Sequence, residues 1–217
     1  MARVQNACAG PFGAVYDSWI ERERVARVVG WTVWGMDTRP MFAGMRRAIG
    51  DAPAGATIID VPCGGGVAFR AIRPFQRVRY FAVDLDKEML TRARRRAAEL
   101  GRDQVEIVLG DMRELPFEDG FADLCLSFSG LHMIPDPDRA IAEFGRCVRS
   151  GGELWGTAFL ADGSRRQRLV FGLGRLTGHV APSATAEDLE DWLADAGFSG
   201  IEINPRRGFV VFRARKS

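Results

Sequence analysis

Hydrophobic positions form five short runs between residues 56 and 160. Apolar runs at 57–61, 78–83, 105–109, 121–128 and 153–160 predict buried strands. After the second run, apolar residues recur at helical spacing, which predicts a helix that Asp86 caps and Gly101 ends. A further helix is expected to begin at Asp136-Pro137. Strands that alternate with helices at this pitch predict a parallel sheet with right-handed crossovers.

The two ends of the chain add to this pattern. Helical sequence fills residues 1–50, and a late helix capped by Thr185 precedes apolar runs at 201–203 and 209–212. The predicted fold is therefore α/β: a single-domain, Rossmann-like, doubly wound and mostly parallel seven-stranded sheet with an antiparallel C-terminal hairpin, plus an N-terminal helical cap. We place the cap or lid at 1–50 and the main domain at 51–217, with 161–182 as an inserted lid segment.

Composition and charge narrow the class of protein. The 217 residues are 47% hydrophobic and 27% charged, with a net charge of +2, so nothing indicates a nucleic-acid partner. The four cysteines form no CxxC pair and there are two histidines, so we expect no metal site. No secretory signal and no run of eighteen apolar residues is present, so we expect a cytoplasmic protein without stable membrane insertion.

Acids and glycines gather where the predicted strands end. In an open parallel sheet, ligands bind beyond the carboxyl ends of the strands, where the strand order reverses. The glycine run 64–66 lets backbone approach a ligand, and Asp84 can accept hydrogen bonds from ribose hydroxyls. Asp111 ends the third strand, near the expected place of an adenine amine. The spacing of about twenty residues from the glycine turn to Asp84 fits a nucleoside.

The same turn indicates which nucleoside. A dinucleotide site has a third glycine, but Phe69 stands at that position. Asp60 opens the turn with an acid, which favours a cationic ligand over a pyrophosphate. S-adenosylmethionine carries a sulfonium and an ammonium and has no phosphate.

These motifs together resemble the class I, Rossmann-like S-adenosylmethionine-dependent methyltransferases of the small-molecule type, such as the ubiquinone and menaquinone methyltransferases. The resemblance covers about 56–213, and its quoted runs are Asp60-Val-Pro-Cys-Gly-Gly-Gly, Ala82-Val83-Asp84, Gly110-Asp111, Leu131-His132 and the late Ala196-Gly197-Phe198. The ordered set is specific, whereas any one run alone is weak.

The resemblance implies a set of cofactor-binding residues: Asp60, Pro62, Cys63, Gly64, Gly66, Asp84, Leu85, Asp111, Met112 and Ser127. It implies that Asp84 binds ribose, that Leu85 packs on adenine, that Asp111 hydrogen-bonds adenine, and that Ser127 contributes backbone near the sulfonium. One residue departs from the family. Pro62 stands where glycine is usual, so the turn must work without that N–H.

Three side chains are candidates for catalysis. Methyl transfer is an in-line displacement, and it needs a base only where the acceptor's proton does not leave easily. His132 follows the fourth strand and His179 lies in the connection after the fifth, while Tyr16 could close over the cofactor. Each of them could instead be a packed residue. We expect a small-molecule acceptor, for which a hydrophobic compound is one candidate, between residues 10–50 and 161–182. The oligomeric state stays open.

Three other functions make different demands on the sequence. A nicotinamide-dependent reductase needs Tyr-x-x-x-Lys, and Ile20 and Asp84 stand four residues after the two tyrosines. A nucleic-acid methyltransferase needs an Asn- or Asp-Pro-Pro-aromatic run after the fourth strand, where Ser127-Phe-Ser-Gly stands. A non-catalytic S-adenosylmethionine-binding module is not excluded by sequence.

The segment 165–176 interleaves arginines with leucine, valine and phenylalanine. A basic amphipathic helix of this kind can lie on an anionic membrane or meet a lipophilic substrate. It can equally be a lid helix with a solvated outer face. Trp19, Trp31 and Trp34 could line an apolar pocket or simply pack within the cap.

Overall fold

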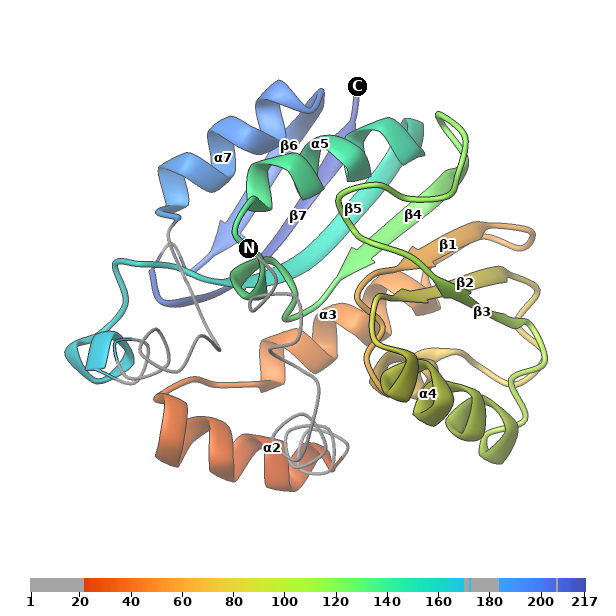
Figure 1. Ribbon diagram of the computed structural model, residues 1–217, viewed down its shortest axis with the longest axis horizontal. Helices are drawn as coiled ribbons and strands as arrows, with labels where there is room; N and C mark the ends of the chain where they lie inside the picture. The colour runs from red at the N-terminus through yellow and green to blue at the C-terminus, as the bar shows by residue number, and fades with distance from the viewer. Residues whose placement is uncertain (1–21, 170–171, 173–183, 206) are drawn as a thin grey trace.

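The computed structural model describes residues 22–169, 172, 184–205 and 207–217. Its centre is a seven-stranded sheet with the order β3-β2-β1-β4-β5-β7-β6 (Figure 1). The strands are β1 Thr57–Asp60, β2 Arg79–Asp84, β3 Val105–Leu109, β4 Ala122–Ser127, β5 Val148–Phe159, β6 Phe198–Asn204 and β7 Phe209–Lys216. The helical elements are α2 Glu23–Val29, η2 Gly30–Trp34, α3 Arg39–Gly50, η3 Val67–Ala71, α4 Lys87–Glu99, η4 Leu131–Met133, α5 Pro137–Cys147 and α7 Ala186–Asp195.

The predicted topology is confirmed. The strands β1 to β5 are parallel, and the strand order reverses between β1 and β4. The strand β7 runs antiparallel to both β5 and β6 and lies between them, which completes the sheet with the expected hairpin. The point of reversal is where a doubly wound sheet places its ligand, so the carboxyl ends of β1 and β4 locate the site.

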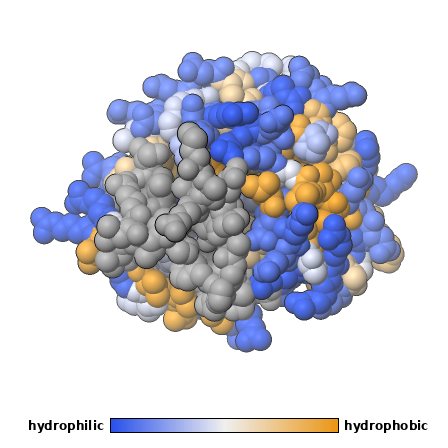
Figure 2. Space-filling view, viewed as in Figure 1, coloured by the Kyte–Doolittle hydropathy of each residue, from blue (hydrophilic) through white to orange (hydrophobic). Residues whose placement is uncertain are grey.

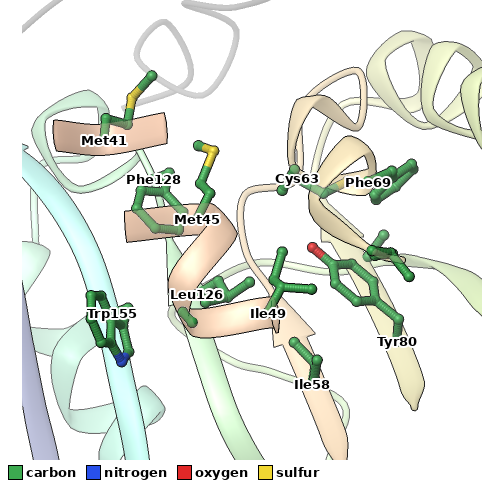
Figure 3. Packing of buried hydrophobic residues seen from close by; sticks show 14 of the residues in the cluster. Met41, Met45, Ile49, Ile58, Cys63, Phe69, Tyr80, Leu126, Phe128 and Trp155 are labelled. Carbon is green, nitrogen blue, oxygen red and sulfur yellow. The ribbon is translucent and has the colours of Figure 1, made fainter. Parts of the chain in front are cut away.

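Helices cover both faces of the sheet because the inner strands are apolar on both sides. Ile58 of β1 belongs to the core that α3, η3 and α4 cover, whereas its neighbour Ile59 belongs to the core under α5 and α7. Figure 3 shows Ile49 of α3 among side chains from the strands of the first core, including Ile58 and Leu126. The helix α3 thus packs directly on the sheet, and a boundary at residue 50 stays a prediction.

Two segments differ from the pattern expected. The strand β5 begins at Val148, directly after α5, instead of at residue 153. Gly152 permits this path, because a Cβ there would lie 2.7 Å from the Val148 Cγ1 and 2.9 Å from the Asp123 carbonyl oxygen. The N-terminal region contains a π-helical turn, η2, directly after α2, which the 3.6-residue periodicity does not predict.

The N-terminus of α4 offers a local test of the fold. The Asp86 carboxylate accepts hydrogen bonds from the backbone N–H groups of Glu88 (2.7 Å) and Met89 (3.4 Å). We expect Asp86→Ala to lower the free energy of unfolding by about 1 kcal/mol, because these donors lose their partner. Urea unfolding measures this, with the exposed Glu118→Ala as the matched control. Equal stability of the two variants would contradict the assignment of the cap.

Candidate cofactor and acceptor site

The turn after β1 holds the predicted glycine run in a fixed shape. The Cys63 N–H donates to the Val83 carbonyl (2.8 Å), and the Gly66 N–H donates to the Cys63 carbonyl (3.0 Å). Gly64 and Gly66 have φ values of 52° and 80°, which favour glycine. A Cβ on Gly66 would meet the Phe69 ring at 2.4 Å, whereas a Cβ on Gly64 would meet nothing within 4 Å. Gly66 therefore serves packing, and Gly64 presents its backbone to open space.

Asp84 at the end of β2 is bound to this turn. One carboxylate oxygen accepts from the Gly64 N–H (2.8 Å), and the other accepts from the Asp86 N–H (2.9 Å). Burial raises the pKa of Asp84, and these backbone hydrogen bonds oppose the rise. Each oxygen keeps a further lone pair for a ligand donor. Leu85 follows directly and is 47% exposed, so an apolar surface lies beside an oriented carboxylate.

Asp60 at the end of β1 is buried and shares its environment with Tyr80. The Tyr80 hydroxyl donates to an Asp60 carboxylate oxygen at 2.9 Å. Burial raises the pKa of Asp60 to about 7; the negative charge of Asp84 adds to the rise, and the Tyr80 hydrogen bond opposes it. In Figure 3 the Tyr80 hydroxyl points toward the turn that carries Cys63. A cationic neighbour would stabilise the ionised form of such a buried carboxyl.

Tyr80 was not singled out from the sequence. One signal was available, because a tyrosine inside a strand buried on both faces needs a partner for its hydroxyl. The parallel register pairs Ile58 with Tyr80 and Asp60 with Ala82, so Tyr80 and Asp60 lie near each other on neighbouring strands.

Asp111 lies in a different environment. Arg113 donates to both of its carboxylate oxygens, at 2.7 Å from Nη2 and 3.0 Å from Nε, and this ion pair lowers the pKa of Asp111. Met112 between them is buried. A contact from Asp111 to adenine stays a prediction, and the carboxylate would have to share its lone pairs with Arg113. The sequence pattern gives no signal that singles out Arg113.

Two buried polar atoms lie at or just after the carboxyl end of β4, the second strand at the switch point. Within the described part of the chain, the Ser127 Oγ and the His132 Nδ1 have no hydrogen-bond partner. The His132 ring packs edge-on against Phe159, with 4.7 Å between ring centroids. Burial lowers the pKa of His132 to about 4, so the ring is neutral at physiological pH. The other two predicted catalytic residues, Tyr16 and His179, lie outside the described residues.

Pro62, the departure from the family pattern, packs against Gly130. A Cβ on Gly130 would lie 2.2 Å from the Pro62 Cδ and 3.3 Å from the Met112 Cε. Gly130 directly precedes η4, the short helix that carries His132. The proline ring thus joins the turn after β1 to the segment after β4, a contact that requires glycine at position 130.

Among the described residues, no cluster of three or more His, Cys, Asp or Glu is arranged to hold a metal ion. Within the same residues, no helix is both long and apolar enough to cross a membrane.

Comparison with known proteins identifies the family. A model of the methyltransferase domain matches residues 59–156, which include the turn, Asp84, Asp111 and His132. Phosphatidylethanolamine N-methyltransferase of Cereibacter sphaeroides is 33% identical over 153 residues, which cover 70% of each chain. The chain belongs to the S-adenosylmethionine-dependent methyltransferase family.

Two further comparisons define the limits of this likeness. Arsenite methyltransferase of Halobacterium salinarum is 28% identical over 167 residues, 75% of this methyltransferase chain and 42% of that protein. The chain spans less than half the length of several curated relatives it matches. A SAM-dependent methyltransferase of Thermotoga maritima, described as a possible histamine N-methyltransferase, has the same fold at 17% identity, with a TM-score of 0.69 and coverage of 99% and 100% of the two chains.

The raised pKa of Asp60 predicts a pH dependence of stability in the free methyltransferase. Between about pH 4 and pH 7 the folded protein holds a proton on Asp60 that the unfolded chain has released. The unfolding free energy contributed by Asp60 therefore falls as pH rises through this window, by at most about 1.4 kcal/mol per pH unit. Asp60→Asn removes this contribution.

Urea unfolding of both proteins from pH 4 to pH 8 checks the prediction. The stability advantage of Asp60→Asn over the wild-type protein should grow as pH rises to 7 and level off above it. Parallel stability curves would show that Asp60 ionises at its ordinary pKa.

The contact between Pro62 and Gly130 predicts coupling between two substitutions. Gly130→Ala places a methyl group against the proline ring and should destabilise the methyltransferase by about 1–3 kcal/mol. Pro62→Gly removes the ring, so the double variant should be more stable than the sum of the two single effects predicts. Additive effects in this double-mutant cycle would show that the two residues do not constrain each other.

Proposed function

We propose that this chain is an enzyme that transfers a methyl group from S-adenosylmethionine to a small, apolar acceptor. One observation carries the proposal: the Gly64 N–H holds the Asp84 carboxylate at 2.8 Å beside open space, at the switch point of the sheet. Three features lie together at this point: the oriented Asp84 carboxylate, the backbone of Gly64, and the half-exposed Leu85 side chain. This is the donor and acceptor set that an adenosyl group requires.

The residues of the turn fit the charge of this cofactor as well. When bound, S-adenosylmethionine supplies an electrophilic methyl group on a sulfonium. In the proposal Asp84 binds the ribose hydroxyls, Leu85 packs on adenine, and Cys63 and Gly64 line the methionine side. Asp60 is a buried acid at the end of β1, directly before the turn, and its raised pKa supports a cationic neighbour.

The remaining predicted contacts are part of the same proposal. Asp111 and Met112 border the adenine, Gly66 and Pro62 fix the shape of the turn, and backbone at Ser127 lies near the reacting centre. These residues bind and align the reactants in a water-poor site, which is the main demand of an in-line displacement.

His132 faces the acceptor in this proposal. Its imidazole is neutral and its Nδ1 has no partner among the described residues, so it can hydrogen-bond an acceptor hydroxyl or amine. A histidine with a pKa of about 4 is a weak base in the free protein. Its first role is therefore to orient the acceptor, and it can hold a proton that the acceptor releases as its methyl bond forms.

Apolar side chains around His132 support an apolar acceptor. Phe159 packs on the histidine ring, and Trp34 lies 6.1 Å from Phe159 between ring centroids. The Ser129 hydroxyl approaches the Met41 sulfur at 3.7 Å, which places α3 beside the segment after β4. Two relatives are named for lipid-like substrates, as a phosphatidylethanolamine N-methyltransferase and a demethylmenaquinone methyltransferase.

The other functions weighed from the sequence are less well supported. A nicotinamide-dependent reductase does not fit membership in the methyltransferase family. A non-catalytic S-adenosylmethionine-binding module remains the alternative, because the same cofactor contacts would serve it. A cytoplasmic location and the absence of a nucleic-acid partner belong to the proposal, and the oligomeric state stays open.

Calorimetric titration with S-adenosylhomocysteine tests the cofactor assignment. Asp84→Asn should weaken binding at least about tenfold, or ~1.4 kcal/mol, because a charge-assisted hydrogen bond is lost. Asp103→Asn, an exposed acid between α4 and β3, is the matched control and should bind like the wild-type protein. Equal affinity in both variants would refute the ribose assignment.

Transfer of a radioactive methyl group from S-adenosylmethionine to fractionated lipid extracts then separates the enzyme from the binding module. Label that enters the lipid fraction supports the enzyme. Tight S-adenosylhomocysteine binding without transfer to lipid or aqueous extracts would favour the non-catalytic module.

A further inference from the structure

Exposed apolar side chains concentrate on one part of the molecule, which we call the α2 surface and define as residues 22–34 and 164–169. It holds Val25, Val28, Trp31, Val33 and Leu169, five of the eight large hydrophobic residues that are exposed in the described part of the chain. Trp31 is 70% exposed and Leu169 is 68% exposed. Such a concentration indicates an interaction surface, because single exposed hydrophobics are normally scattered.

The two segments of the α2 surface are in contact. The Arg166 guanidinium donates to the Trp31 carbonyl at 3.4 Å. The Arg166 side chain also lies beside Gly35, because a Cβ added to Gly35 would be 3.6 Å from the Arg166 Cδ. In Figure 2, hydrophobic and hydrophilic atoms lie side by side along the lower edge of the molecule, where Figure 1 shows α2. The exposed apolar side chains thus occur on two contacting segments that also carry charged side chains.

Positive charge surrounds these apolar side chains. The α2 surface contains six exposed arginines: Arg22, Arg24, Arg27, Arg165, Arg166 and Arg168. Its one acid, Glu23, forms an ion pair with Arg46 at 3.0 Å. The neighbouring Asp37 is bound through both carboxylate oxygens by Arg39. The whole chain has a net charge of only +2, so the rest of it is net acidic.

We propose that the α2 surface docks this protein reversibly on an anionic lipid surface. A helical face with exposed aliphatic residues, a tryptophan and flanking arginines inserts at the boundary between headgroups and acyl chains. The arginines are attracted to anionic headgroups, and the acidic remainder of the protein is repelled, which orients the molecule. A second copy of the chain fits this surface poorly, because two sets of six arginines would face each other.

Docking would also place the proposed acceptor site next to the lipid. The turn η2 carries Trp31 on the α2 surface and Trp34, whose ring packs toward Phe159 and thereby toward His132. An apolar acceptor could pass from the lipid to this side without crossing water. This last step rests on the proposed function, whereas the docking does not.

Sedimentation with vesicles tests the docking. The full chain is mixed with vesicles of phosphatidylglycerol and phosphatidylcholine, and in parallel with phosphatidylcholine alone. We expect at least about tenfold stronger binding to the anionic vesicles at low salt, and a clear loss at high salt. Failure to bind anionic vesicles at low salt would overturn the proposal.

Matched variants locate the contact. Arg24→Glu/Arg27→Glu should weaken binding to anionic vesicles at least about tenfold, and Arg77→Glu/Arg94→Glu, which makes the same change of charge elsewhere, should weaken it much less. Trp31→Ala should weaken binding several-fold, while Phe75→Ala, at a residue 97% exposed outside the α2 surface, should not. Equal effects within either pair would overturn the proposal.

Two further measurements keep the outcomes distinct. All four variants should bind S-adenosylhomocysteine like the wild-type protein, which shows that they fold and that the docking test does not depend on methyl transfer. Sedimentation equilibrium without vesicles measures self-association. A dimer that Trp31→Ala abolishes would mean that a second copy covers the α2 surface, and this would overturn the lipid assignment.

Discussion

The hydrogen bond from the Gly64 N–H to the Asp84 carboxylate connects the ends of two neighbouring strands. The parallel pairing of β1 and β2 brings these ends together, and the positive φ of Gly64 turns its N–H toward the acid. The remaining features of the site follow from this contact. It fixes the carboxylate, keeps the backbone of Gly64 beside open space, and leaves Leu85 exposed next to both.

Asp60 shows what such a site costs in stability. A carboxyl group buried at the end of β1 loses hydration, and a single hydrogen bond from Tyr80 replaces only part of it. A residue chosen for stability alone would be apolar at this position, because its neighbours Ile59 and Val61 are buried and apolar. Keeping an acid at this position is reasonable where a cationic ligand provides the missing interaction, so the raised pKa of Asp60 is consistent with the proposed cofactor.

The sequence predicted the strands, their doubly wound and mostly parallel arrangement, and the helices around the site, because apolar runs and capping residues are local signals. Asp84 and the glycine turn could be placed for the same reason, since each follows a buried strand directly. The partners of these residues could not be predicted. Tyr80 reaches Asp60 through strand register, and Gly130 contacts Pro62 across the switch point, which no local pattern records. Arg113 is only two residues from Asp111, but the turn that pairs them was not predicted. The π-helical turn η2 was missed because its period differs from the one sought.

The two sides of the switch point differ in how their polar groups are satisfied. On the side of β1 and β2, the carboxyls of Asp60 and Asp84 have protein partners that hold them in place before any ligand arrives. On the side of β4, the Ser127 hydroxyl and the His132 Nδ1 have no partner among the described residues. Buried polar groups without partners lower stability, and a ligand that supplies the hydrogen bond recovers the cost. The side of β1 and β2 is therefore suited to the cofactor, which is the same in every reaction cycle. The side of β4 offers hydrogen bonds that can orient an acceptor whose remaining surface is apolar.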